Sequence, residues 1–291
     1  MIQAQNFIAG AWSKAANASK DINPSNTGDV VGEFPQASAA DAETAIAAAK
    51  AAFPAWSRST VQQRHDVLKK IGDEIMARKD EIGRLLSREE GKTLAEGIGE
   101  TARAAQIFLF FAGECLRQAG DKLGSVRPGV DIEITREPLG VIGLITPWNF
   151  PIAIPAWKIA PALAYGNCVV FKPADLVPGS AHALSEIISR AGLPAGVFNL
   201  VMGRGSVVGE AMLKHNDVNA ISFTGSVGTG RKIAATCVGT DPMKKIQLEM
   251  GGKNPMVVLD DADLKIAVEA CVNGAFFSTG QRCTASSRLI V

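Results

Sequence analysis

Histidine is scarce in this sequence, with 3 residues among 291. His65, His182 and His215 each lie in a polar stretch with helical character, and none has a second histidine or a carboxylate at metal-ligand spacing. We therefore interpret them as solvated helix residues and predict no metal site. A cysteine hydrolase needs a histidine as its base, so this class of enzyme is disfavoured.

The sequence also lacks an excess of charge, a membrane-length apolar run and paired cysteines. A net charge of +1 does not indicate a basic surface that would bind nucleic acid or an acidic membrane. The longest apolar stretch, residues 141–164, contains four prolines and Lys158, so no membrane span is expected. Residues 1–6 do not have the pattern of a signal peptide. The cysteines number five and have no redox or metal spacing, which predicts a reducing compartment, the cytoplasm.

The order of strand and helix patterns predicts an α/β fold. From Val141 onward, continuous apolar strands alternate with helices, which is the pattern of a doubly wound parallel sheet. Before them we expect short strands and turns, followed by helices, one of which starts with a capping box from Ser38 to Asp41. The chain is long enough for one large or two moderate domains. The predicted sheet strands cover residues 141–145, 168–171, 197–202, 220–223, 246–250 and 256–259, and the early helices cover 39–53, 60–75, 80–90 and 95–117.

Residues 121–137 have a different character. The segment from Val130 to Glu137 alternates apolar and polar residues, as in a half-exposed strand. Glycine and proline separate it from the rest of the chain. An exposed strand edge can pair with another chain, so we predict a projecting arm here.

Cys283 is the candidate nucleophile. It lies among small and polar residues between Ser278 and Ser287, whereas Cys168 lies in an apolar run typical of a core cysteine. The adjacent Arg282 and exposed backbone N–H groups would favour the reactive thiolate. From this stretch alone, an ordinary loop residue and a nucleophile explain the pattern equally well.

Functional turns follow several of the predicted strands. The carboxyl ends of parallel strands meet at one edge of a sheet, where ligands bind. A glycine-rich turn that opens a helix, such as Gly225 to Gly230, can bind phosphate through backbone N–H groups, although it lacks the usual dinucleotide fingerprint. The turns occupy residues 146–151, 172–175, 203–209, 224–230 and 249–253.

Taken together and in order, these motifs resemble the NAD(P)-dependent aldehyde dehydrogenase family, and the likeness extends over all 291 residues. The motifs are Pro147-Trp148-Asn149-Phe150-Pro151, Lys172-Pro173-Ala174, Phe223-Thr224-Gly225-Ser226, Glu249-Met250-Gly251-Gly252-Lys253 and Gly280-Gln281-Arg282-Cys283. The resemblance implies a Rossmann-like NAD(P)-binding domain from residues 1–119 and 139–250. It also implies an oligomerisation arm at 120–138 and the start of an α/β catalytic domain at 251–291.

The resemblance assigns roles that agree with the chemistry of the residues. Cys283 would attack an aldehyde carbonyl, and the amide of Asn149 with the Cys283 backbone N–H would stabilise the oxyanion. Glu249 would be the general base that activates water to hydrolyse the thioester. Each residue alone also fits a structural role: a strand-end turn for Asn149 and a surface carboxylate for Glu249.

The remaining assignments concern cofactor and substrate. NAD or NADP is implied, and Asp175 stands where members that prefer NAD often carry glutamate, which leaves space near the ribose 2′-oxygen. The implied cofactor contacts are Ile145, Thr146, Pro147, Trp148, Lys172, Asp175, Gly205, Gly209, Phe223, Thr224, Gly225, Ser226, Thr229, Gly230, Met250 and Gly251, and the implied substrate contacts are Phe150, Trp157, Arg282 and Thr284.

Residues 152–158 resemble 2,5-dioxopentanoate (α-ketoglutaric semialdehyde) dehydrogenases, and Trp157 replaces an arginine typical of succinic semialdehyde enzymes. The family continues well beyond its catalytic cysteine, so we expect this chain to lack most of the catalytic domain and to form a homodimer or homotetramer when complete. Two alternatives remain: a CoA-acylating aldehyde dehydrogenase, whose members typically lack the glutamate at position 249, and an inactive nucleotide-binding fragment.

Overall fold

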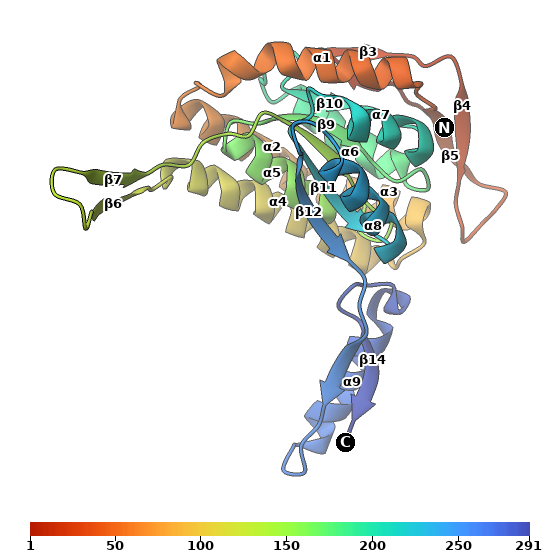
Figure 1. Ribbon diagram of the computed structural model, residues 1–291. Coiled ribbons are helices and arrows are strands. Elements are labelled where there is room, and N and C mark those ends of the chain that lie inside the picture. Colours follow the sequence, from red (N-terminus) through yellow and green to blue (C-terminus); the bar gives the residue numbers. More distant parts are fainter.

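A seven-stranded sheet forms the centre of the computed structural model, which describes residues 1–291 (Figure 1). Five of its strands are parallel. Four of them are mostly buried, as predicted for strands covered on both faces, whereas the edge strand Lys245–Met250 is largely exposed. The predicted α/β fold class is confirmed. In spatial order these strands are β12 (Lys245–Met250), β11 (Ala220–Gly225), β8 (Val141–Ile145), β9 (Cys168–Lys172) and β10 (Phe198–Leu200).

The sheet is mixed, whereas the sequence predicted a parallel one. Strand β2 (Asn6–Ile8) pairs antiparallel with β10, and β3 (Ala11–Ser13) pairs antiparallel with β2. The side chain of Asn6 is 1% exposed, and its Oδ1 accepts a hydrogen bond from Met202 N at 2.8 Å. The N-terminal hairpin thereby covers an edge of the parallel set that would otherwise expose unpaired backbone groups. Short segments carry no signal for so distant a partner, which is why the pattern missed it.

Helices cover both faces of the sheet, as a doubly wound fold requires. Helices α1 (Ala39–Trp56), α7 (Glu210–Lys214) and α8 (Val227–Val238) lie on one face. Helices α5 (Ala153–Ala164) and α6 (Pro178–Ser189) lie on the other, and α2 (Val61–Ala77), α3 (Lys79–Glu90) and α4 (Leu94–Leu116) form a further layer against them. The predicted capping box at Ser38 and Asp41 is present at the start of α1. A short π-helical turn, η1 (Gly205–Gly209), precedes α7.

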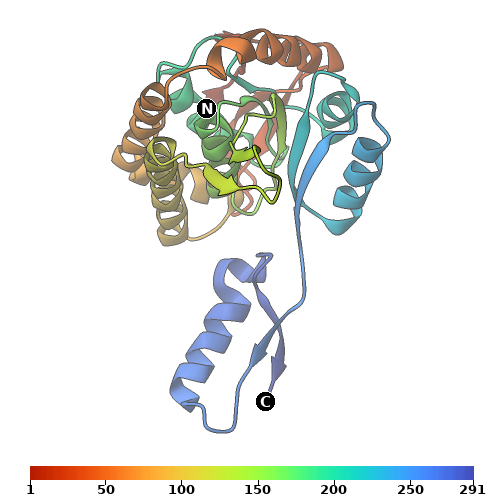
Figure 2. The same ribbon diagram turned by 60° about the vertical axis from the view of Figure 1, so that its left-hand side comes forward.

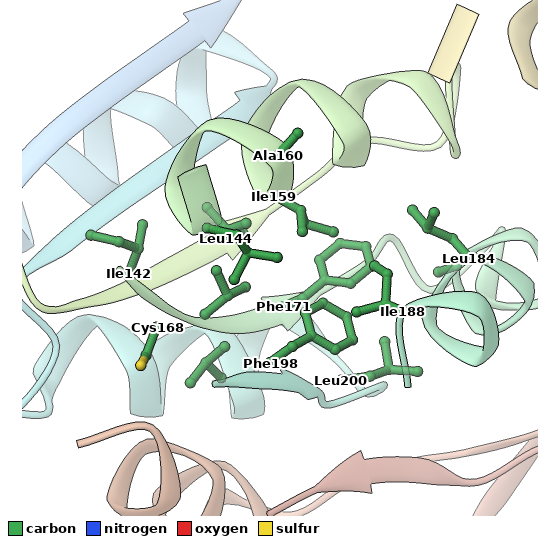
Figure 3. Packing of buried hydrophobic residues seen from close by; sticks show 14 of the residues in the cluster. Ile142, Leu144, Ile159, Ala160, Cys168, Phe171, Leu184, Ile188, Phe198 and Leu200 are labelled. Carbon is green, nitrogen blue, oxygen red and sulfur yellow. The ribbon is translucent and has the colours of Figure 1, made fainter. Parts of the chain in front are cut away.

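The core lies between the parallel strands and their helices. Figure 3 shows Phe171 of β9 and Phe198 of β10 packed beside Ile188 of α6, and the two phenyl centroids are 6.4 Å apart. Each such side chain is buried, which contributes roughly 1.5–3 kcal/mol relative to exposure. This packing fixes the strands and therefore the turns at their carboxyl ends.

Two parts project from this body. The arm is the hairpin of β6 (Asp121–Gly124) and β7 (Asp131–Ile134), whose residues are all exposed. The second part, which we call the C-terminal unit, contains β13 (Asn254–Val257), α9 (Leu264–Phe276), the 3-10 turn η2 (Phe277–Gly280) and β14 (Ser286–Ile290). The chain crosses from β12 to this unit as a single connection (Figure 2). A small sheet of β1 (Ile2–Gln3), β5 (Val30–Pro35) and β4 (Ala18–Ile22) lies near the N-terminus.

Candidate active site

The register of the parallel strands brings the predicted turns to one edge of the sheet. Ile145 pairs with Lys172 on one side and with Phe223 on the other. Thr224 in turn pairs with Glu249. Residues up to 78 positions apart in the sequence, such as Ile145 and Phe223, are therefore neighbours at the carboxyl ends of β8, β9, β11 and β12.

Lys172 is the centre of the predicted nucleotide contacts. Its side chain is buried, and its Nζ donates to Asp175 Oδ1 at 2.5 Å. A Cβ added to Gly205 would lie 4.0 Å from Lys172 Nζ, and one added to Gly209 would lie 3.9 Å from Ile145 Cδ1. The π-helical turn thus passes beside Lys172 and Ile145 with no side chain of its own at these two positions. This is the kind of uncrowded space that a nucleotide would need.

The start of α8 is the second predicted cofactor element. Ser226 is its N-cap: its Oγ accepts from Thr229 N at 3.3 Å and hydrogen-bonds Thr229 Oγ1 at 2.9 Å. A Cβ on Gly230 would lie 2.4 Å from Met250 Sδ, so a larger residue here would require the Met250 side chain of β12 to move. The glycine-rich segment is therefore mostly the first turn of a helix and not a loop. Such a helix start offers backbone N–H groups to an anion.

The turn after β8 connects the sheet to the cysteine loop, residues 277–285. Thr146 is buried, Pro147 and Trp148 are half-buried, and the turn then reaches Asn149. Asn149 Nδ2 donates to the carbonyl oxygen of Gln281 at 2.8 Å, and its Oδ1 is buried without a hydrogen-bond partner. Nδ2 carries a second N–H that this contact leaves available. Two segments that the sequence assigned to one site are thus in direct contact.

A buried ion pair that no sequence pattern indicated supports this turn. Lys92 Nζ donates to Glu100 Oε2 at 2.7 Å and to the backbone oxygen of Asn149 at 2.8 Å. Glu100 Oε1 accepts from the N–H groups of Ile152 and Ala153, which precede and open α5. Both ionic side chains are 3% exposed. The only sequence signal is charge on helices that we interpreted as packing faces.

Cys283 lies half-buried in the cysteine loop. Its carbonyl oxygen accepts from Asn254 Nδ2 at 2.7 Å, which ties the loop to β13. Arg282 Nη2 donates to the carbonyl oxygens of Asn273 and Gly274, at 3.0 and 2.9 Å. The Arg282 charge is therefore committed to the C-terminal end of α9, where a cation is favoured. Thr284 is exposed, and the substrate roles of Arg282 and Thr284 stay predictions.

A cavity of about 420 Å³ lies beside the cysteine loop. Its walls include the two aromatic residues predicted to contact substrate, Phe150 and Trp157, together with Phe277 and Ser278 of the loop. Trp157 is 48% exposed. The chain therefore brings the predicted aromatic contacts and the turn that precedes Cys283 to the same hollow.

Glu249 is exposed at the end of β12, and no hydrogen bond joins it to the cysteine loop. The buried amine of Lys158 on α5 faces this strand, and its Nζ donates to Ser222 Oγ at 2.7 Å and to Gln247 Oε1 at 3.0 Å. Burial lowers the pKa of Lys158 to about 8, while the charge of Glu249 acts in the opposite direction. Lys158 is thus a titratable neighbour of the predicted base.

Gly251 begins the connection to the C-terminal unit directly after β12.

A larger hollow of about 630 Å³ lies at the opposite ends of the strands, between Tyr165, Asn167 and Lys245, and contains none of the predicted site residues. No helix combines the length and the apolar character needed to cross a membrane.

The three histidines are half-buried, which corrects the expectation of solvated residues. His65 Nδ1 hydrogen-bonds the backbone oxygen of Ala112 at 2.9 Å. His182 packs on Trp12 with ring centroids 4.9 Å apart, and burial lowers its pKa. His215 Nδ1 accepts from a backbone N–H two residues later. Neighbouring elements, α4 for His65 and β3 for His182, cover helix faces that the sequence pattern left to solvent.

Comparison with known proteins follows this geometry. The Aldehyde dehydrogenase family model matches residues 12–291. An alpha-ketoglutaric semialdehyde dehydrogenase of Bacillus subtilis (strain 168) is 48% identical over 288 residues, which cover 98% of this chain and 59% of that protein. A 2,5-dioxopentanoate dehydrogenase of Saccharolobus solfataricus is 42% identical over 285 residues, which cover 98% of this chain and 60% of that protein.

Solved structures agree with these relatives. A crystal structure described as an E. coli NADP dependent enzyme has a TM-score of 0.95 and 40% identity, and covers 99% of this chain and 60% of that one. A betaine aldehyde dehydrogenase from Staphylococcus aureus in complex with NAD+ has a TM-score of 0.93 and 37% identity, and the match covers 98% of this chain and 57% of that one. The chain therefore spans about 60% of the length of the relatives it matches.

Proposed function

Because the chain belongs to the aldehyde dehydrogenase family, we propose that the protein oxidises an aldehyde to a carboxylic acid with NAD+ or NADP+. The observation that carries this proposal is the 2.8 Å hydrogen bond from Asn149 Nδ2 to Gln281 O. It brings the predicted oxyanion donor against the loop of the predicted nucleophile, at the same sheet edge as Lys172.

The chemistry begins at Cys283. Its thiolate attacks the aldehyde carbon, the C–S bond forms, and the carbonyl π electrons move to oxygen to give a thiohemiacetal. The second Nδ2 hydrogen of Asn149 and the backbone N–H of Cys283 stabilise the developing charge. Removing one donor of this kind typically slows an enzyme about 10²–10³-fold.

The nucleotide would lie along the carboxyl edge of the sheet. Lys172 would hydrogen-bond the adenosine ribose, and the start of α8 at Ser226 would face the pyrophosphate. The space beside Gly205 and Gly209 supports this fit, because no side chain fills it. A nicotinamide held there would supply the hydride acceptor for oxidation of the thiohemiacetal on Cys283 to a thioester.

Glu249 would complete the cycle as the general base. A thioester reacts slowly with neutral water, and a carboxylate that removes the water proton accelerates the reaction. The exposed position of Glu249 at the end of β12 leaves it accessible to water. Hydrolysis releases the carboxylic acid and restores the Cys283 thiol.

We further propose 2,5-dioxopentanoate as a substrate. The support is the similarity to the two semialdehyde dehydrogenases named above and the resemblance of residues 152–158 to such enzymes. The test is oxidation of 2,5-dioxopentanoate by the full-length gene product, followed by NAD(P)H absorbance and identification of 2-oxoglutarate. Release of a CoA ester in preference to the free acid would favour the acylating alternative. If no aldehyde leads to NAD(P)H formation, the proposed oxidation is wrong and the alternative of an inactive nucleotide-binding protein is favoured.

Assembly is proposed from the arm. Leu123, Ile132 and Ile134 project from a hairpin that contacts nothing else, and each is at least 40% exposed. We propose that residues 120–138 join subunits into a homodimer or homotetramer. This arm interrupts the proposed nucleotide domain (1–119 and 139–250), and the proposed catalytic domain starts at 251. A monomer in sedimentation of the full-length protein would contradict this.

The five cysteines are all free, which supports a cytoplasmic location.

A further inference from the structure

The turn that precedes Cys283 has an unfavourable backbone conformation. Ser278 and Thr279 have φ angles of 52° and 53°, and Gly280 follows with 72°. The left-handed region is unfavourable for a residue with a side chain, and single residues, not consecutive ones, normally adopt it. Two non-glycine residues in succession therefore need support from outside the turn.

Glu96 of α4 provides that support. Its Oε1 accepts a hydrogen bond from Ser278 N at 2.9 Å, although the two residues are 182 positions apart. Its Oε2 accepts from Thr93 N at 3.0 Å and from Thr93 Oγ1 at 2.8 Å, as part of the capping box of α4. Ser278 is 5% exposed, so water does not replace this acceptor.

The carboxylate is ionised at neutral pH. Burial acts to raise the pKa of Glu96, but the hydrogen bonds from Thr93 and Ser278 outweigh it and the pKa is lowered. The bond to Ser278 is thus charge-assisted, which makes it roughly twice as strong as a bond between neutral groups.

A second contact holds the other end of the turn. Asn149 Nδ2 binds Gln281 O, one residue after Gly280 and two before Cys283. Glu96 and Asn149 therefore fix the segment 278–281 from both sides. The position of the thiol relative to the Asn149 amide depends on both contacts.

We propose that Glu96 is a positioning residue for the nucleophile, because its carboxylate holds the left-handed turn from which Cys283 extends toward Asn149. The role of Cys283 as nucleophile rests on the proposed function, whereas the fixation of the turn does not. Glu96 makes no contact with the strand-end residues assigned to the nucleotide, so its loss affects the reaction and not cofactor binding.

The simpler alternative is that Glu96 only caps α4. Two matched controls separate these roles. Thr93→Ala removes the capping hydroxyl but leaves Glu96 able to bind Ser278 N. Asp41→Ala removes the corresponding carboxylate of the capping box in α1, where Asp41 accepts only from Ser38.

The experiment compares Glu96→Ala, Glu96→Gln and both controls in the full-length protein. Hydrogen–deuterium exchange of peptides that contain residues 277–283 reports the turn, and the rate of the NAD(P)H burst reports the reaction. We expect Glu96→Ala to speed exchange in this segment on the order of tenfold or more, since it removes a bond to a charged acceptor. We expect the burst to slow by at least about tenfold, since small misplacements of reacting groups have large effects on rate.

Glu96→Gln should be intermediate, because its Oε1 can still accept from Ser278 N. Both controls should leave exchange and burst within about twofold of wild type, and the cofactor dissociation constant should not change in Glu96→Ala. Thr93→Ala reproducing both effects, or unchanged exchange in Glu96→Ala, would overturn the proposal. If the wild-type protein oxidises no aldehyde, the proposed function fails, while the exchange measurement still decides whether Glu96 fixes the turn.

Discussion

Replacing Lys92 with methionine would test how the Asn149 turn is held. Lys92 Nζ connects four groups: the carboxylates of Glu100 and Glu90, the backbone oxygen of Asn149, and the ring of Phe150, whose centroid is 4.2 Å away. Methionine preserves most of the side-chain volume, so the change removes the charge with little cavity formation. Glu100 keeps its two backbone donors but loses its counter-ion inside the protein.

The magnitude follows from burial. Both side chains of the pair are 3% exposed, so removing one leaves an uncompensated charge, which costs roughly 3–5 kcal/mol. The freed carbonyl of Asn149 adds a desolvation penalty of about 1–3 kcal/mol if water does not reach it. Because these effects share one site they do not add fully, and we expect a loss of about 3–5 kcal/mol in the free energy of unfolding.

Urea unfolding of the full-length protein measures this loss. The double variant Lys92→Met/Glu100→Gln should recover part of it, since neither charge of this pair then remains and only the Glu90 carboxylate is left beside the site. The coupling should be about 0.5–3 kcal/mol. Lys69→Met is the control, because the Lys69–Asp73 pair has a similar distance of 2.6 Å but side chains more than half exposed. A loss in Lys92→Met no larger than in Lys69→Met would refute the assignment of a structural role to the buried pair.

Four further outcomes are expected. Substoichiometric iodoacetamide should label Cys283 first, because burial raises the pKa of the competing thiol Cys115 to about 11. The variant Cys283→Ala should have no oxidation activity. Equal labelling of Cys115 and Cys283, measured by peptide mass mapping, would count against the assignment. Glu249→Gln should give a burst of about one equivalent of NAD(P)H and then turnover slowed ~10²–10⁴-fold, and a missing burst would mean that Glu249 acts before hydride transfer. Because the pKa of Lys158 is lowered to about 8, the unfolded chain binds more protons than the folded protein between pH 8 and 10.5. The free energy of unfolding of wild type relative to Lys158→Met should therefore rise with pH over this window in denaturant titrations. A difference that does not change with pH would contradict this. Steady-state kinetics should show both NAD and NADP accepted, because Asp175 is shorter than glutamate, whereas strict exclusion of NADP would oppose that explanation.

The elements whose signals are local could be predicted from the sequence. The capping residues Ser38 and Thr60 mark the starts of α1 and α2, and the apolar run from Val141 to Ile145 is β8 as expected. The strand-end turns followed from topology, since parallel strands necessarily collect their carboxyl ends at one edge. The resemblance added the roles of residues, but the contact between Asn149 and Gln281 came only from the structure.

The support of the site could not be predicted in the same way. Lys92, Glu96 and Glu100 lie on or next to a helix whose sequence explains them equally well as surface charges and caps. Apart from the Lys92–Glu100 pair itself, their partners at the site are 52 to 182 positions away, and no spacing rule connects such residues. Short strands were expected near Phe7, but their pairing with β10 was missed for the same reason, because nothing in three residues specifies which sheet edge they join.

The pairing of β2 with β10 has a consequence for synthesis of the protein in the cell. Asn6 emerges among the first residues, but its partner Met202 follows 196 positions later. At about 5–20 residues per second, the ribosome needs roughly 10–40 s to supply it. During this time Phe7 and Trp12 have no sheet to cover them, and the hairpin is a target for chaperones or for a neighbouring nascent chain. Slower translation between β2 and β10 would lengthen that exposure, so the yield of soluble protein would depend on codon choice in this interval.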